Sequence, residues 1–404
     1  MDSLKIASAG KSGATVRSDC RIEIELTGDK VVKVELVSKV EALYGENITA
    51  QLNELTKFFN LTGAVIRIED FGALPYTIAA RFEAAFKILF PSEKKEFLPE
   101  MPEKNKYSTA KDKMRRSRLY LPGNEPKFFV NAGLHRPDGI ILDLEDSVAP
   151  AEKYAAAFLV RNTLRTVDFY GAERMVRINQ LPRGLDDLEF IVPHNIHVIL
   201  IPKCESPDDV VKVEAKVNEI KKKRKVEGNT FFMPIIESAK GVLKAYEIAS
   251  ASGNICSLAI GLEDYTADLG TQRTLEGKES FFARSMVVNA ARAAGVQPID
   301  TVFSDVSDME GLTQSVIEAK SLGFEGKGCI HPRQIDPIHK AFAPAPEEIE
   351  KAKKIVNAYN EAERRGLGVV ALGSKMIDAP VVKRAQRTIR LAVLNGLMKE
   401  EEIA

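Results

Sequence analysis

The stretch IILDLEDSV, residues 140–148, is an alternating apolar strand that ends in three carboxylates. Side chains along a strand point alternately to its two faces. Here the two faces hold Ile140, Leu142 and Leu144 on one side and Ile141, Asp143 and Glu145 on the other. Because carboxylates this close repel one another, we expect a cation near Asp143, Glu145 and Asp146. A solvated strand end that caps the next helix is the alternative interpretation.

The composition limits the class of protein. At 404 residues the chain is too long for one ordinary domain, and 45% apolar residues suffice for one large core and a small one. Lys+Arg and Asp+Glu both number 57, so the net charge of zero does not support a nucleic-acid binder. The four cysteines show no CxxC spacing, and no apolar run has the length of a signal core or a membrane span. The sequence therefore predicts a cytoplasmic protein without a nucleic-acid or membrane partner.

Residues 115–345 alternate strand-like runs with helix-length stretches. The predicted strands are 116–121, 139–144, 175–178, 197–202, 230–236, 257–261, 301–303 and 326–330. The predicted helices between them include 152–165, 207–223, 241–250, 281–294 and 309–322. Eight strands separated by helices match a TIM (β/α)₈ barrel of the α/β class. A doubly wound open sheet is the alternative, but LPGNEP after the first strand is not the G-x-G-x-x-G loop that such a sheet needs.

Segments on both sides of the barrel have a different pattern. Residues 1–91 predict a small α+β domain, in which 21–28 and 30–38 alternate like two paired strands joined by a turn. The rest of this domain is predicted as a helix at 46–60, a strand at 63–70 and a further strand and helix within 74–89. The charged segment 92–114 predicts an exposed linker. Residues 346–404 predict a helical extension that packs on another subunit or on its own barrel.

Polar side chains follow six of the predicted strands, at the end of a barrel where such folds keep their chemistry. They include Asp143, Arg177, Lys203, Glu237, Asp264 and His331. Any one alone also fits a helix cap or a solvated surface charge. Oxygen ligands without a thiolate or histidine cluster favour Mg²⁺ or Mn²⁺ over zinc. We therefore expect Glu237 and Asp264 to hold a divalent ion and Arg177 to clamp a substrate carboxylate, which is chemistry suited to C–C bond cleavage beside a carbonyl.

Several motifs resemble one enzyme family. RSRLYLPGNEPKFF, DGIILDLEDSVAP, MVRIN, ILIPKCES, PIIESAKGVLKAYEIA, GLEDYTADLG, GCIHPRQI and GSKMIDAPVVKRAQ together resemble the citrate lyase β-subunit family, the HpcH/HpaI aldolases that include malyl-CoA and citramalyl-CoA lyases. The resemblance implies a TIM barrel with Mg²⁺ at the carboxyl ends of its strands, and it implies trimers or hexamers.

Residue roles follow from the same resemblance, motif by motif. Glu237 and Asp264 are implied as metal ligands, and Arg177 as the carboxylate clamp. Asp378 resembles the acid/base group that a neighbouring subunit inserts into the site, and Glu145 is implied to support the water shell of the metal. Beside Arg177, we expect Arg116 and Lys203 to contact substrate.

The amino-terminal domain resembles the citrate lyase γ-subunit, a small acyl carrier protein. The likeness rests on VEALYGENI (40–48) and DFGALPYTIAAR (70–81). In that family a serine of a G-x-x-x-S-x-D stretch carries a phosphoribosyl-dephospho-CoA arm. Here the stretch is GATVRSD, which puts Arg17 at the modified position and Ser18 one step later. Either Ser18 carries the arm, or free CoA thioesters are used instead.

These observations give three hypotheses of function. The first is a Mg²⁺-dependent lyase that cleaves a citryl thioester to oxaloacetate and an acetyl thioester, together with an α-type acyl-transferase subunit. The second is a lyase for citramalyl-CoA or malyl-CoA. The third is a carrier or scaffold subunit whose barrel is inactive. The side group of the acyl substrate is not decided by any of these motifs.

Overall fold

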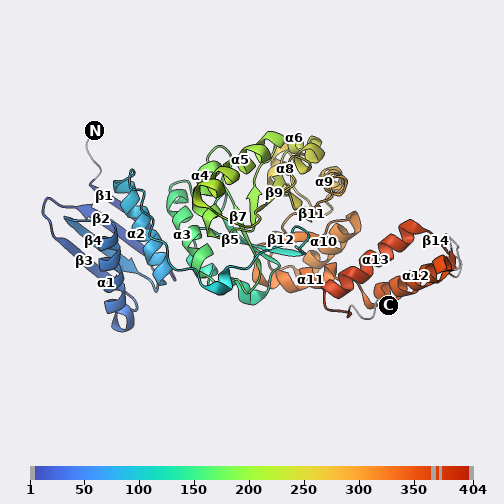
Figure 1. Ribbon diagram of the computed structural model, residues 1–404, viewed down its shortest axis with the longest axis horizontal. Helices are drawn as coiled ribbons and strands as arrows, with labels where there is room; N and C mark the ends of the chain where they lie inside the picture. The colour runs from blue at the N-terminus through green and yellow to red at the C-terminus, as the bar shows by residue number, and fades with distance from the viewer. Residues whose placement is uncertain (1–4, 365–369, 373–374, 400–404) are drawn as a thin grey trace.

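The computed structural model describes residues 5–364, 370–372 and 375–399, and it is elongated (Figure 1). A small sheet domain lies at one end, a closed barrel in the middle and a helical hairpin at the other end. The outermost residues of the predicted first and last segments, 1–4 and 400–404, lie outside the described residues. No helix in the described part of the chain is long and apolar enough to cross a membrane.

The amino-terminal domain is a four-stranded sheet in the order β1-β2-β4-β3 with two helices on one face. Its elements are β1 (Ile6–Gly10), β2 (Cys20–Leu26), β3 (Val32–Ser38), α1 (Glu41–Phe58), β4 (Ala64–Asp70) and α2 (Pro75–Leu89). The predicted pairing of 21–28 with 30–38 is wrong, because β4 lies between β2 and β3 and pairs with both. The predicted strand within 74–89 is also wrong, because one helix begins at Pro75, which is favoured in a first turn.

The barrel is closed by eight parallel strands, so the predicted TIM-type fold is confirmed. The strands are β5 (Ser117–Pro122), β6 (Gly139–Asp143), β7 (Glu173–Arg177), β8 (Val198–Ile201), β9 (Phe231–Ile236), β10 (Ser257–Ile260), β11 (Gln297–Asp300) and β12 (Gly326–Cys329). The predicted seventh strand at 301–303 is wrong, because the strand β11 lies directly before it in the chain. Pro298 resembles a strand breaker, yet its carbonyl accepts from the Glu325 amide at 3.0 Å and so joins the ladder.

Helices cover the outside of the barrel (Figure 1). They are α3 (Lys153–Thr166), α4 (Gly184–Ile191), α5 (Pro207–Arg224), α6 (Ala239–Leu243), α7 (Ala245–Ala249), α8 (Leu262–Asp268), α9 (Phe281–Ala293), α10 (Met309–Leu322) and α11 (Ile335–Phe342). The alternation predicted for the opening strand is confirmed. Ile140, Leu142 and Leu144 join the core between strands and helices, whereas Ile141 joins a separate core inside the barrel.

The sheet domain is docked on the barrel through α2, which lies between its own sheet and α3 (Figure 1). Arg81 of α2 makes hydrogen bonds of 3.0 and 2.7 Å to the buried Asp19 and one of 3.3 Å to the Asn124 carbonyl after β5. Arg161 of α3 pairs with Glu83 of α2 at 2.6 Å, and both side chains are fully buried. The domain is therefore fixed to the barrel by the buried ion pair between Arg161 and Glu83 and by the hydrogen bond from Arg81 to the Asn124 carbonyl.

The linker 92–114 lies against the barrel. The Tyr107 hydroxyl donates to the Ala172 carbonyl at 2.5 Å, and Thr109 donates to Glu173 at 2.5 Å. Asn105 is buried and donates to the Arg165 carbonyl at 2.9 Å. Because Ala172 and Glu173 lie at or just before the start of β7, this segment crosses the amino end of the barrel, and the predicted exposed linker is corrected to an anchored one.

A helical hairpin follows the barrel and projects away from it (Figure 1). It consists of α12 (Pro346–Arg364), β13 (Val370–Leu372), β14 (Lys375–Ile377) and α13 (Ala379–Leu394). The two helices bury a small core of their own, which includes Ile349, Val356 and Ile389. Because this core is separate from that of the barrel, the hairpin stands as an arm.

Candidate active site

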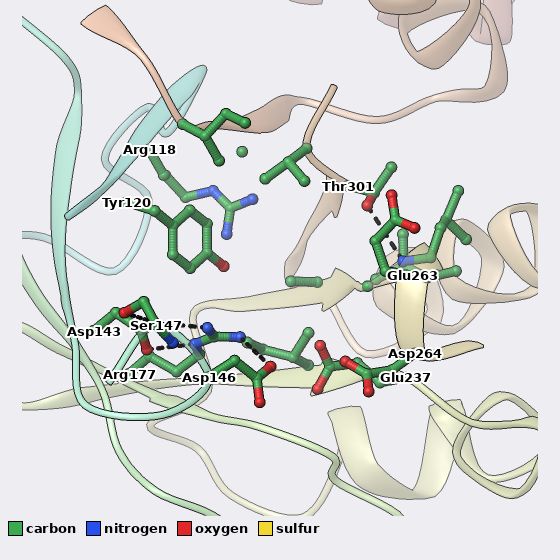
Figure 2. A pocket seen from close by; sticks show the side chains of 18 of the residues that line it. Arg118, Tyr120, Asp143, Asp146, Ser147, Arg177, Glu237, Glu263, Asp264 and Thr301 are labelled. Atoms are coloured by element: carbon green, nitrogen blue, oxygen red, sulfur yellow. Dashed lines mark hydrogen bonds and ion pairs between the residues drawn. The ribbon is translucent and has the colours of Figure 1, made fainter. Parts of the chain in front are cut away.

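A pocket of about 450 Å³ opens at the carboxyl ends of the barrel strands (Figure 2). Its walls come from residues at or just after these ends, including Pro122, Asp143, Arg177, Glu237, Asp264 and Thr301. Because parallel strands all end at the same rim, side chains distant in sequence meet here. The predicted convergence of Arg177, Glu237 and Asp264 on one pocket is what the structure shows.

Asp143 and Arg177 form a buried pair at one side of the pocket. Two hydrogen bonds of 2.7 and 2.8 Å join the Arg177 guanidinium to both carboxylate oxygens of Asp143. Burial disfavours ionisation of Asp143, but the bonds and charge of Arg177 outweigh it and lower the pKa of that carboxyl. Arg177 also lies 5.4 Å over the ring of Tyr120. Asp143 therefore sets the direction of the Arg177 fork.

Lys203 and Arg177 are the cations expected beside the acidic cluster. Lys203 Nζ lies 3.1 Å from Glu145, 3.5 Å from Asp146 and 3.4 Å from Asp264. Arg177 Nη1 lies 3.0 Å from Glu145 Oε2, although this buried oxygen accepts no well-aligned hydrogen bond from the described residues. Two cations from neighbouring strands therefore pair with the three carboxylates of residues 140–148 and leave one negative charge in excess.

Glu237 and Asp264 lie on the opposite side of the pocket, with their carboxylates turned toward each other (Figure 2). Glu237 follows β9 directly, is buried, and accepts from the Lys203 backbone N–H at 2.8 Å. Burial raises the pKa of Glu237 to about 8. Gly261 provides room for this carboxylate, because a Cβ there would clash with Oε1 of Glu237.

This donor set fits a divalent cation that takes oxygen ligands. The described residues hold no cluster of three or more His, Cys, Asp or Glu in a metal-binding arrangement. Mg²⁺ commonly binds through one or two carboxylates and keeps several waters. Glu237 and Asp264 meet that requirement as a pair, and Glu237 makes no ion pair with any of the described residues.

Three predicted residues lie elsewhere. Arg116 precedes β5 at the opposite end of the barrel, where it pairs with Asp138 at 2.7 Å, so its predicted contact with substrate is corrected. Asp378 caps α13 by accepting from the Val381 N–H at 3.2 Å, and the arm carries it away from its own pocket. Ser18 lies in a left-handed turn with φ 56° beside the buried Asp19.

The sequence reasoning missed Arg118 and Tyr120, which both line the pocket. Both lie on β5 two residues apart, so alternation directs them to the same face. A charged residue inside the apolar run RLYLP was the available signal, because a buried strand rarely carries an arginine without a reason.

The comparisons with known proteins agree with this geometry. Residues 116–332 match HpcH/HpaI aldolase/citrate lyase, and residues 8–89 match the malonate decarboxylase delta subunit (MdcD). The chain belongs to the HpcH/HpaI aldolase/citrate lyase family. It is 41% identical over 294 residues to citrate lyase subunit beta of Leuconostoc mesenteroides subsp. cremoris, covering 72% of this chain and 97% of that protein.

Two further relatives extend the comparison. Human mitochondrial citramalyl-CoA lyase is 32% identical over 290 residues, covering 69% of this chain and 85% of that protein. The crystal structure of CitE from Mycobacterium tuberculosis with magnesium, acetoacetate and coenzyme A is 30% identical with a TM-score of 0.57, covering 69% of this chain and 98% of that one. The predicted carbon–carbon lyase and the predicted carrier-like domain are confirmed at the level of the family.

Proposed function

We propose that this protein is a Mg²⁺-dependent lyase that cleaves a citryl thioester to oxaloacetate and an acetyl thioester. The observation that carries the proposal is the convergence of Glu237, Asp264 and Arg177 on one pocket in a family member with a docked carrier-like domain. A relative of this chain, the citrate lyase beta subunit of M. tuberculosis, was crystallised with oxaloacetate and magnesium. Mn²⁺ is the alternative ion for the same oxygen ligands.

Each residue of the pocket has a separate role in the proposed reaction. Glu237 and Asp264 would hold the divalent ion, which supplies Lewis-acid polarisation of the substrate oxygens when bound. Arg177, fixed by Asp143, presents its fork to the carboxylate on the carbinol carbon. An acid/base group of the site takes the carbinol proton, and the O–H electron pair forms the C=O of oxaloacetate. The C–C bond breaks, and its electron pair passes to the thioester as an enolate that takes a proton at carbon. Glu145 and Lys203 maintain the charge balance beside this centre.

Asp378 is proposed as the group that returns the proton to the enolate. In its own chain it lies on the projecting arm, far along the hairpin from the barrel (Figure 1). We therefore propose an oligomer, a trimer or hexamer, in which the arm of one subunit reaches the pocket of the next. General acid catalysis of this kind contributes about 10²- to 10⁴-fold.

The carrier-like domain is proposed to deliver the acyl group. Asp19, next to Ser18, is tied through Arg81 to the Asn124 carbonyl, two residues after Pro122 at the pocket wall. A phosphoribosyl-dephospho-CoA arm on Ser18 would thus start beside the loop that edges the pocket. Exchange of acetyl for citryl would require a separate α-type transferase subunit. If Ser18 carries no arm, the substrate is free malyl-CoA or free citramalyl-CoA, and the name of the human relative points to the second.

An assay of citryl, citramalyl and malyl thioesters with and without Mg²⁺ tests the proposal, together with the intact mass of the protein purified from its source. Cleavage of the citryl thioester only with Mg²⁺ supports it, and added mass that maps to Ser18 supports the tethered form. Asp264→Asn should abolish Mg²⁺ binding measured by calorimetry. Glu263→Gln is the matched control, because Glu263 lies next to Asp264 and pairs with Arg273 at 2.6 Å. No cleavage of any thioester with Mg²⁺ would refute the lyase and favour an inactive scaffold.

A further inference from the structure

Arg118 is a buried cation at the floor of the pocket whose guanidinium has no carboxylate partner among the described residues. Its relative exposure is 2%, and it lines the pocket. Of its five N–H groups, one donates to Met233 Sδ at 3.0 Å, a weak acceptor, and one to the Asp300 carbonyl at 3.3 Å. Its Nε is buried without a partner. Burial of such a charge is costly unless something pairs with it.

Most other buried arginines of the chain show what is missing; Arg174 also lacks a carboxylate, but its guanidinium lies over the rings of Tyr107 and Phe169. Arg81, Arg115, Arg161 and Arg177 each make two bonds to one carboxylate. The carboxylate of Asp300, whose carbonyl accepts from Arg118, is already shared by Lys327 at 2.8 Å and Arg284 at 3.1 Å. Arg284 pairs in addition with Glu318. Three cations therefore face two carboxylates, which leaves one positive charge in excess at the floor.

Space is available in front of this charge. Figure 2 shows the Arg118 guanidinium directed into the cavity, with Tyr120 between it and Arg177. Gly328, which faces Arg118 on β12, also lines the pocket, and a side chain there would meet Val302 and Tyr120. The pocket therefore offers two arginines at different depths, Arg177 at the rim and Arg118 at the floor.

We propose that Arg118 binds a second, terminal carboxylate of the acyl substrate and so selects a dicarboxylic oxo acid over a monocarboxylic one. This inference rests on the proposed lyase function and names the substrate class. The carboxylate on the carbinol carbon meets Arg177 at the rim, and a carboxymethyl group on the same carbon points to Arg118. A methyl or hydrogen in that position leaves Arg118 without its partner, so the citryl group is preferred to citramalyl or malyl.

The test compares wild type with Arg118→Met, which keeps the length and removes the charge, and with Arg118→Lys, which keeps the charge and loses the fork. Calorimetry with Mg²⁺ measures oxaloacetate and pyruvate binding, and the assay gives kcat/KM for citryl and citramalyl thioesters. Wild type should prefer oxaloacetate and the citryl group. Arg118→Met should reduce both preference ratios by about 10- to 100-fold, and Arg118→Lys should lie between.

The outcomes separate this inference from the proposed function. If wild type cleaves thioesters but the two ratios are the same in Arg118→Met, the inference is overturned and the lyase stands. If wild type binds pyruvate as tightly as oxaloacetate, the inference is also overturned. If no thioester is cleaved, the lyase proposal fails, and the binding ratio of the two oxo acids still decides the role of Arg118. Circular dichroism checks that the variants fold. If Arg118→Met does not fold, the comparison of wild type with Arg118→Lys decides the inference.

Discussion

Replacing Arg161 by methionine should release the carrier-like domain from the barrel. Arg161 and Glu83 are both fully buried, and their paired oxygens and nitrogens lie 2.6 and 3.1 Å apart. Breaking a buried pair commonly costs 3–5 kcal/mol, because one charge is left without compensation. Lys87 also lies 3.0 Å from Glu83 and would retain part of the balance, so the lower end, about 3 kcal/mol, applies.

That cost has a measurable consequence in hydrogen exchange. Glu83 becomes hydrated when the domain undocks. The substitution should therefore raise the equilibrium constant for undocking by a factor on the order of 10² over wild type. Helix α2 is covered by its sheet and by α3 while docked, and its amides should exchange faster by a similar factor. Mass spectrometry of peptides that span α2 measures this rate. Peptides from β8 and β9, deep in the barrel, should keep the wild-type rate.

Two further variants control the interpretation. Arg67→Met removes an exposed arginine that pairs with Glu23, Glu25 and Glu35 on the open face of the same sheet. Exposed pairs contribute about 0–1 kcal/mol, so exchange in α2 should change little. Replacing both Arg161 and Glu83 by methionine removes the unpaired charge and should restore slow exchange. Wild-type exchange of α2 in Arg161→Met alone would show that this ion pair does not hold the domain.

Three other predictions concern acid stability, the arginine clamp and the arm. Burial lowers the pKa of His197 to about 4 and of His194 to about 2, so the unfolded chain takes up protons that the folded chain refuses below pH 6.5. The free energy of unfolding should fall by about 2 kcal/mol per histidine from pH 7 to pH 5. His197→Gln should make this fall smaller by the amount due to one histidine, as measured by urea titrations at both pH values. Asp143→Asn should lower kcat/KM about 10- to 100-fold and leave Mg²⁺ affinity by calorimetry unchanged, since Asp143 contacts Arg177 rather than Glu237. Co-expressed Asp378→Ala and Glu237→Gln chains should regain activity that each lacks alone, and failure to do so would place the acid within one chain.

Much of the barrel follows from local pattern. Strands that are buried on both faces appear in the sequence as short apolar runs. Because helix-length stretches separate these runs, the pattern predicts a closed parallel sheet. Charged residues directly after those runs must meet at one rim, which is why the amino-acid sequence alone suffices to group Arg177, Glu237 and Asp264. The error at β11 arose because Pro298 carries the usual signal of a break, while the ladder requires only its carbonyl.

The docking of the two domains could not be read from the sequence. Arg81, Glu83 and Arg161 lie on helices with mixed composition, and helix charges normally face water. Only the three-dimensional approach of α2 to α3 shows that they are buried and paired. The strand order of the small sheet could not be predicted for the same reason, because β3 pairs with β4 although a whole helix separates them in the chain. Arg116 and Arg118 differ in the same way: two residues in one strand segment serve opposite ends of a barrel.

The charge balance of the pocket favours the divalent ion that we propose there. Five carboxylates gather beside the pocket, namely Asp143, Glu145, Asp146, Glu237 and Asp264, and among the described residues their ion pairs come from Arg177 and Lys203. Asp143 and Glu145 make the shortest pairs, so the excess negative charge is spread over Asp146, Glu237 and Asp264, and among the described residues Glu237 makes no ion pair. Burial raises the pKa of Glu237 to about 8. A bound divalent ion would supply positive charge beside Glu237 and Asp264 and leave Lys203 to pair with Glu145 and Asp146. The acidic strand end at 140–148 therefore acts indirectly. It holds Arg177 and Lys203 in place, so that Glu237 and Asp264 are left for the proposed metal.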